Sequence, residues 1–211
     1  MIPPAASIIV YLNGSSSAGK STLGAALLEA MDEPFILVGA DTIFGGVDER
    51  HNRRVTPGGS DPQVEAGVGW LLDGDDRITE IRFGPLGRRM MYGLHRMVAG
   101  LADEGNNVVV DDVIFDADMM AHLAALMAGR PAYLVGVRCS LETLEAREAA
   151  RGNRINGLAA LLFEQPHRHA VYDIEVDTTT TRPPEAAARI RAHLHQHQPR
   201  AFNEIATRGE S

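Results

Sequence analysis

Gly14-Ser15-Ser16-Ser17-Ala18-Gly19-Lys20-Ser21 is the stretch of this sequence that decides its fold. An apolar run over residues 7–13 precedes it, and Leu23, Leu27 and Met31 recur at helical spacing after it. Its glycines permit backbone conformations that other residues rarely adopt, so consecutive N–H groups can point toward phosphate oxygens. A strand, a glycine loop and a helix in this order predict a phosphate-binding P-loop.

Each polar position of this loop has an expected partner in a bound nucleoside triphosphate. Lys20 is expected to reach the β- and γ-phosphates, and the Ser21 hydroxyl is expected to ligate Mg²⁺. The alternative, a Gly/Ser turn without a ligand, does not account for the adjoining strand and helix. We therefore expect ATP and Mg²⁺ as cofactors, with nucleotide contacts from Gly14, Ser15, Ser16, Ser17, Ala18, Gly19, Lys20, Ser21, Thr22 and Arg147.

Strand-like and helix-like segments alternate along the chain, which predicts an α/β fold with a parallel sheet. Apolar runs typical of strands lie at 7–13, 35–40, 108–113, 132–138 and 174–176. Helical patterns lie at 20–31, 85–104, 116–128, 141–151 and 184–197. In the longest helix Leu86, Met90, Leu94, Met97 or Val98, and Leu101 are expected to face the core.

The domain organisation follows from where this alternation holds and where it fails. We expect a single P-loop domain over residues 1–197. Between about 45 and 84, scattered Gly, Pro, Asp and Arg predict an irregular insertion in which only 68–72 resembles packed structure. Residues 198–211 are expected to be a tail.

Acidic residues end two of the predicted strands, where ligands of open α/β sheets bind. Asp111 and Asp112 end the third strand, and both are candidates for Mg²⁺. Because side chains alternate along a strand, one should serve the metal and the other can cap a neighbouring backbone; the sequence leaves open which. Asp41, between small residues at the end of the second strand, is the candidate base for an acceptor hydroxyl. Its alternative role is an N-cap for the segment that starts at Thr42.

Three arginines, at positions 147, 151 and 154, lie in a segment that could close as a lid over the phosphates. Arg147 and Arg151 are four residues apart and would share a helix face. A guanidinium suits spread phosphate charge, and a closing arginine helps to exclude water. We expect Arg151 and Arg154 to act in catalysis within a lid over about 147–165; the alternative is that these arginines pair with neighbouring glutamates on a solvated face.

Composition excludes several classes of protein. The net charge of −8, from 28 acidic and 20 basic side chains, lacks the basic footprint of nucleic-acid binders. The single cysteine, Cys139, allows no internal disulfide, fits a reducing compartment and is expected to be buried. Residues 1–7 lack signal-peptide features, and no apolar run approaches the ~20 residues that span a bilayer. We expect a cytoplasmic protein without nucleic-acid or membrane partners; a homo-oligomer stays possible.

Six motifs stand in order across residues 8–197: GSSSAGKS at 14–21, GAD at 39–41, VDDV at 110–113, GVRC at 136–139, ARGNR at 150–154 and YDIEVDTT at 172–179. Together they resemble the chloramphenicol phosphotransferase family. The resemblance implies a nucleoside-kinase-like P-loop NTPase with a five-stranded parallel sheet and a small helical lid. It also implies ATP-dependent phosphorylation of an antibiotic hydroxyl, which serves self-protection in drug producers. The family's base aspartate falls on Asp41, its lid arginines on Arg151 and Arg154, and its adenine region after Thr178.

The acceptor is the part of this function that the sequence leaves open. Residues 45–82 match the family poorly, although the corresponding region there helps to form the acceptor pocket. An amphenicol-type antibiotic is the leading acceptor; a nucleoside, a sugar or another metabolite is the alternative. A regulatory P-loop ATPase without a small acceptor is a third hypothesis, and the absence of an Asn-Lys-x-Asp signature weakens a GTPase reading.

Overall fold

The computed structural model describes residues 7–56, 61–151 and 155–208 of the 211-residue chain. Its strands are β1 (Ile9–Asn13), β2 (Phe35–Gly39), β3 (Asn52–Val55), β4 (Val68–Leu72), β5 (Ile78–Phe83), β6 (Asn107–Asp112), β7 (Ala132–Arg138) and β8 (Ile174–Asp177). Its α-helices are α1 (Lys20–Ala30), α2 (Ala40–Phe44), α3 (Pro62–Ala66), α4 (Pro85–Asp103), α5 (Ala117–Met127), α6 (Leu141–Arg151), α7 (Leu158–Leu161), α8 (Pro183–Gln196) and α9 (Ala201–Arg208). Short 3-10 turns are η1 (Glu49–His51) and η2 (Gln165–His167).

The central sheet has the strand order β2-β6-β1-β7-β8, and its strands pair in parallel. This confirms the predicted five-stranded parallel sheet flanked by helices. Asn13 pairs with Asp112 on one side and Gly136 on the other, and Gly39 pairs with Asp111. The carboxyl ends of β1, β2 and β6 therefore meet at one edge of the sheet.

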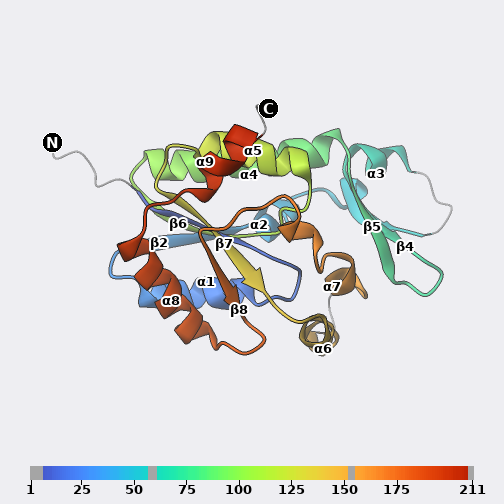
Figure 1. The fold of residues 1–211 in the computed structure, drawn as a ribbon. Helices are drawn as coiled ribbons and strands as arrows, with labels where there is room; N and C mark the ends of the chain where they lie inside the picture. Colours follow the sequence, from blue (N-terminus) through green and yellow to red (C-terminus); the bar gives the residue numbers. More distant parts are fainter. Residues whose placement is uncertain (1–6, 57–60, 152–154, 209–211) are drawn as a thin grey trace.

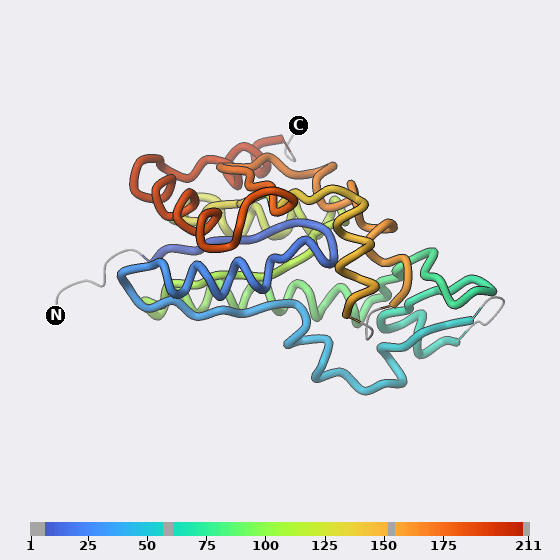
Figure 2. The backbone as a smooth tube through the Cα atoms, turned by 90° about the horizontal axis from the view of Figure 1, so that it is seen from below, coloured from blue at the N-terminus to red at the C-terminus, as the bar shows by residue number. Residues whose placement is uncertain are grey.

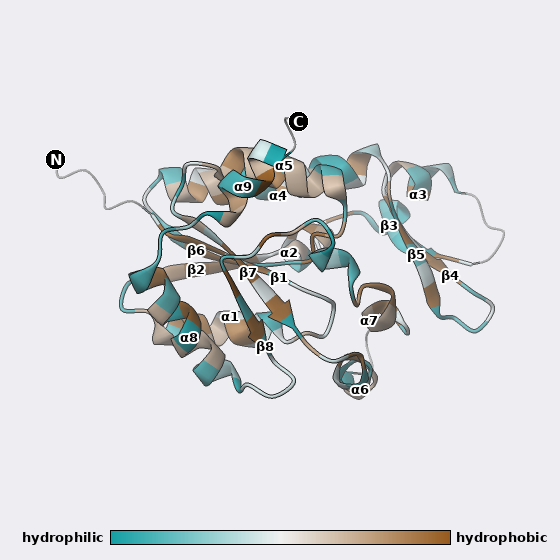
Figure 3. Ribbon diagram, in the orientation of Figure 1, coloured by the Kyte–Doolittle hydropathy of each residue, from teal (hydrophilic) through white to brown (hydrophobic). Residues whose placement is uncertain are grey.

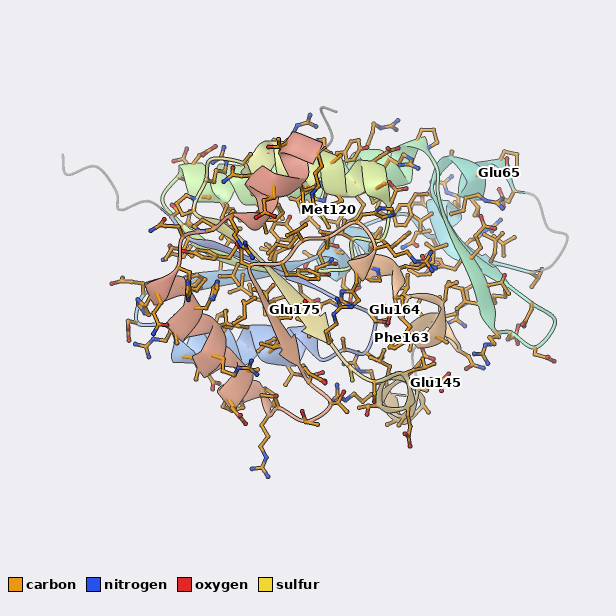
Figure 4. The ribbon with its side chains drawn as sticks, viewed as in Figure 1. Glu65, Met120, Glu145, Phe163, Glu164 and Glu175 are labelled. Carbon is orange, nitrogen blue, oxygen red and sulfur yellow. The ribbon has the colours of Figure 1, made fainter. Side chains whose placement is uncertain are left out.

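Helices cover both faces of this sheet, with α1 and α8 on one side and α4, α5 and α9 on the other (Figure 1). Alternation along β1 explains the two layers, because Ile9 and Tyr11 face α4 and α5 while Val10 and Leu12 face α1 and α8. Met120, labelled in Figure 4, packs between α5 and the sheet. Figure 3 shows apolar residues along the strands and polar ones on the outer helix surfaces. None of the helices described is long and apolar enough to cross a membrane.

The segment expected to be irregular is an ordered second sheet instead. Its order is β3-β4-β5, with β3 and β4 parallel and β4 and β5 antiparallel. Leu72 and Ile78 of this sheet are buried against Leu158 and Leu162, which lie about 80 residues further along the chain. Because these partners are distant in sequence, local periodicity showed only the stretch that became β4.

The predicted lid region lies beside this second sheet. The Ile78 amide donates a hydrogen bond to the Asn156 carbonyl at 2.9 Å, and the Arg77 side chain packs against Gly157. Figure 2 shows the two segments side by side at the end of the molecule away from the N-terminus. The insertion and the predicted lid region therefore pack against each other and both contribute residues to the cavity described below.

The structure also bears on the expected C-terminal tail and on the apolar stripe of the longest helix. Residues 201–208 are the helix α9, and Phe202 and Ile205 are buried against α5 and β1, so this part of the chain is not an unpacked tail. In α4 the buried residues include Met91, Leu94 and Val98, whereas Met97 is exposed. Leu94 and Val98 of the expected stripe are therefore buried, Leu86, Met90 and Leu101 are half-buried, and the buried positions keep helical spacing.

Candidate active site

The edge where β1, β2 and β6 end opens into a cavity of about 250 Å³. The P-loop follows β1, Asp111 and Asp112 end β6, and Asp41 follows β2. Residues from all three places line the cavity: Ser16, Ser17, Gly19, Lys20, Ser21, Asp41, Asp111 and Asp112. The structure thus brings together predicted site residues that are far apart in the sequence.

The P-loop has the local geometry that its glycines predict. A Cβ atom on Gly14 would lie 2.4 Å from the Val137 carbonyl oxygen, so only glycine at position 14 allows the loop to lie this close to β7. Gly19 adopts a φ of 84°, and Ser17 a φ of 63°. The Ser17 hydroxyl is buried and has no hydrogen-bond partner within the described part of the chain. A buried, unpartnered hydroxyl in a loop that starts a helix fits a phosphate oxygen.

Lys20, Ser21 and Asp111 form a polar cluster at the mouth of this loop. The Lys20 Nζ donates to the carbonyl oxygens of Gly14 at 3.1 Å and Ser15 at 2.9 Å, and it lies 3.7 Å from Asp111 Oδ1. The Ser21 hydroxyl donates to Asp111 Oδ2 at 2.5 Å. Thr22 follows on the exposed first turn of α1. A hydroxyl and a carboxylate in contact are oxygen ligands of the type that Mg²⁺ uses beside nucleotide phosphates.

Asp112 has different surroundings from its neighbour. Its carboxylate is 1% exposed, and its Oδ1 accepts a hydrogen bond from the Val113 amide at 2.7 Å. Burial raises the pKa of Asp112 to about 7. Of the two aspartates, Asp111 contacts the loop while Asp112 caps a backbone amide, which is the division of roles that alternation along the strand predicts.

Asp41 lies in the first turn of α2, directly after β2. The N-cap of α2 is Gly39 in an extended conformation, so Asp41 is not the N-cap of this helix. Its carboxylate is exposed at the cavity that also contains Lys20 and Asp111. The short distance along the chain between β2 and α2 holds Asp41 at the sheet edge, where an acceptor hydroxyl could reach it.

Four aromatic residues also line the cavity and are called here the aromatic wall: Phe44, Trp70, Phe83 and Phe115. The rings follow one another, with centroids 6.5 Å apart for Phe44 and Trp70, 6.0 Å for Phe44 and Phe83, and 5.6 Å for Phe83 and Phe115. Sequence analysis missed this wall. The available signal was that the insertion and its flanks hold the only tryptophan in a chain with 5% aromatic residues.

The three predicted arginines have three different outcomes. Arg151, at the end of α6, lines the cavity, whereas Arg154 lies outside the described residues. The Arg147 guanidinium donates to the Thr178 carbonyl at 2.8 Å and the Thr178 hydroxyl at 3.1 Å. Thr178 Oγ1 in turn donates to Ala18 O at 2.8 Å. Arg147 is therefore connected to the P-loop through Thr178.

Within the described ranges, Glu148 forms no ion pair with Arg147 or Arg151. Its buried carboxylate accepts hydrogen bonds from the amides of Gly157 at 2.9 Å and Ala159 at 2.8 Å. It therefore fastens α6 to the start of α7. Glu145, on the same helix, is exposed to solvent (Figure 4). The local sequence did not reveal the role of Glu148, because its hydrogen-bond partners lie at the start of the next helix, α7.

Solved structures with the same fold include several kinases. The chain has a TM-score of 0.60 to a Mycobacterium tuberculosis APS kinase, CysC, solved with AMPPNP and APS, at 16% identity over 92% of this chain and 100% of that one. It has a TM-score of 0.53 to a Deinococcus radiodurans tunicamycin resistance protein, at 14% identity over 92% and 99%. At these identities the similarity shows the fold alone, and it agrees with the predicted α/β fold with a parallel sheet.

Sequence relatives are more informative about ancestry. A Mycobacterium tuberculosis (strain ATCC 25618 / H37Rv) protein named "Putative O-phosphotransferase Rv2636" is 30% identical over 206 residues, which is 95% of this chain and 88% of that protein. The family model described as "Chloramphenicol phosphotransferase-like protein" matches residues 6–195. That match spans the P-loop, both candidate acidic positions and the lid, and the chain belongs to the chloramphenicol phosphotransferase-like family.

Proposed function

We propose that this protein transfers the γ-phosphoryl group of ATP to a hydroxyl group of a small, largely apolar molecule, with an amphenicol-type antibiotic as the leading acceptor. The observation that carries the proposal is that the P-loop, Asp41 and the aromatic wall line one and the same cavity. An ATPase without an acceptor has no use for an apolar chamber beside its phosphate loop. Family membership and a relative named as an O-phosphotransferase support the same reaction.

The nucleotide half of the site would be formed by the P-loop with Lys20, and Ser21 with Asp111 would hold Mg²⁺. Among the described residues, no group of three or more His, Cys, Asp or Glu could hold a metal ion. This fits a cation that is bound jointly by two protein oxygens and the phosphates of its nucleotide. When bound, Mg²⁺ neutralises charge on the β- and γ-phosphate oxygens.

In the acceptor half, Asp41 would accept the proton of the attacking hydroxyl. The acceptor oxygen forms a bond to the γ-phosphorus, the bond from that phosphorus to the bridging oxygen breaks, and ADP leaves. Lys20 and Arg151 would balance the charge that spreads over the transferred group. The aromatic wall would bind the apolar body of the acceptor and displace water from it.

A phosphorylation screen tests this proposal. Purified protein with ATP and Mg²⁺ would be offered chloramphenicol, other neutral aromatic alcohols, nucleosides and sugars, with mass spectrometry to detect the gain of one phosphate. We expect a product from a neutral aromatic alcohol and a kcat loss of roughly 10²–10⁴ for Asp41→Asn. Products from sugars or nucleosides alone would overturn the apolar acceptor. ATP turnover unaffected by Asp41→Asn, with every alcohol inert, would favour the acceptor-free ATPase.

A further inference from the structure

Asn52 links two elements that line the cavity, β4 and α2, although Asn52 itself does not line it. It is the first residue of β3, and its side-chain Oδ1 accepts a hydrogen bond from the Trp70 indole Nε1 at 2.8 Å. Its side-chain Nδ2 donates a hydrogen bond to the Phe44 carbonyl oxygen at 3.1 Å. Both ends of one amide group are therefore used, each toward a different element.

The two elements carry different parts of the proposed reaction. Trp70 lies on β4 and belongs to the aromatic wall, where its ring meets Phe44 edge-on at an interplanar angle of 79°. Phe44 is the last residue of α2, the five-residue helix that also contains Asp41. A constraint on the Phe44 carbonyl therefore constrains the helix on which the candidate base stands.

We propose that Asn52 is a positioning residue that fixes the acceptor wall at Trp70 relative to the α2 helix that carries Asp41. The inference rests on the proposed function for its catalytic consequence. An amide suits this task because it offers a donor and an acceptor on one rigid plane, whereas a carboxylate only accepts and an aliphatic chain does neither. The distance between the apolar body of an acceptor and its reacting hydroxyl would be selected by this link.

A purely structural role for Asn52 would place its side-chain bonds within the small sheet. The pairing of β3 with β4 is made by backbone groups, with Asn52 opposite Val68. One of its two side-chain hydrogen bonds, from Trp70, lies within the small sheet, whereas the other leaves that sheet for the Phe44 carbonyl at the end of α2. The side chain thus connects two parts of the molecule that meet at the cavity.

A first test needs no substrate. Trp70 is the only tryptophan, so a ¹⁵N-labelled sample gives a single indole N–H resonance. We expect this resonance to move upfield and exchange faster with solvent in Asn52→Leu, and to stay near its wild-type position in Asn52→Asp, which retains an acceptor. Asn106→Leu is the matched control, because it removes another side-chain amide that donates to a backbone carbonyl, that of Leu101 at 2.9 Å. An unchanged indole signal in Asn52→Leu would overturn the inference.

A second test separates the two hydrogen bonds by kinetics, with MgATP and chloramphenicol as the probe acceptor. Trp70→Phe should raise the acceptor KM roughly fivefold with little change in kcat. Asn52→Asp should lower kcat roughly fivefold with little change in the acceptor KM. A factor of roughly five is the usual effect of one neutral hydrogen bond. The KM for ATP should stay within about twofold in both. If kcat, the acceptor KM and the KM for ATP all worsened by the same factor, and in proportion to a lowered melting temperature, the result would contradict a positioning role.

The two tests fail separately from the proposed function. A wild-type protein that phosphorylates no alcohol would end the proposed function, while the indole resonance still decides whether Asn52 holds Trp70. A wild-type protein that phosphorylates chloramphenicol, together with variants of Asn52 that do so with unchanged KM and kcat, would end the inference alone.

Discussion

The Oδ2 atom of Asp112 lies 3.9 Å from the Nε2 atom of His95, and both atoms are buried without a hydrogen-bond partner within the described ranges. His95 is on α4 and is held from its other side by His122, at 3.0 Å between their Nδ1 atoms. Burial, and then His122, lower the pKa of His95 to about 3, while burial raises the pKa of Asp112 to about 7. The pair is therefore neutral in the folded protein near pH 5, although its separated members would both be charged.

This neutral pair predicts two opposite dependences of stability on pH. Folded Asp112 keeps its proton between about pH 4 and 7, where the unfolded side chain has lost it, so its contribution to stability falls as pH rises through that window. Folded His95 lacks the proton that its unfolded form binds between about pH 3 and 6.5, so its contribution rises with pH. In wild-type protein the two slopes should largely cancel between about pH 4 and 6.5.

Single variants should expose each slope. In Asp112→Asn the free energy of unfolding should rise with pH up to 6.5, and in His95→Gln it should fall from about pH 4 to 7, each by up to about 1.4 kcal/mol per pH unit. Urea titrations in chelator, which removes free metal, measure both. Curves that run parallel to wild type in both variants would show that the pair is charged in the folded state.

The contact between Ser21 and Asp111 predicts a shared dependence on magnesium. Ser21→Ala and Asp111→Asn should each raise the Mg²⁺ concentration needed for half-maximal phosphate transfer, by at least about tenfold, because each removes an oxygen ligand. In the double variant the fold-increase in this Mg²⁺ concentration should be smaller than the product of the two single fold-increases, since both residues act on one ion. Glu29→Gln, at an exposed position near the end of α1, is the control and should leave the Mg²⁺ requirement unchanged. Independent, multiplicative effects would argue against a common site.

The aromatic wall predicts how acceptor binding depends on Phe83. Phe83→Ala should raise the acceptor KM about tenfold or more, because it removes a large apolar contact surface, while the KM for ATP stays near wild type. Phe83→Leu, which keeps an apolar side chain, should recover part of the affinity. A Phe83→Ala protein with a normal acceptor KM would place the acceptor elsewhere.

Glu148 predicts a difference in stability between two glutamates of one helix. Glu148→Ala leaves the Gly157 and Ala159 amides without their buried acceptor and should cost about 2–4 kcal/mol of unfolding free energy. Glu145→Ala, on the exposed side of α6, should change it by less than about 0.5 kcal/mol. Chemical denaturation of both variants measures the difference. Equal small effects would mean that the lid is not fastened by Glu148.

Much of the nucleotide half of the site could be predicted from the sequence. The eight residues from Gly14 to Ser21 specify their own geometry, because the glycines are needed where Val137 approaches and where φ is positive. Strand alternation also predicted that Asp111 and Asp112 would have unlike surroundings. These features depend on residues close in the sequence and on the rule that strand ends carry the site.

The proposed acceptor half of the cavity was decided by tertiary structure. Phe44, Trp70, Phe83 and Phe115 stand on four separate segments, and only the packing of the small sheet against the lid brings them to one cavity. The same packing turned an apparently irregular insertion into β3, β4 and β5. The sequence by itself determined the backbone geometry of the P-loop, since such a loop needs only local information. The rest of the cavity lining depends on contacts between residues far apart in the chain, and no local pattern encodes those contacts.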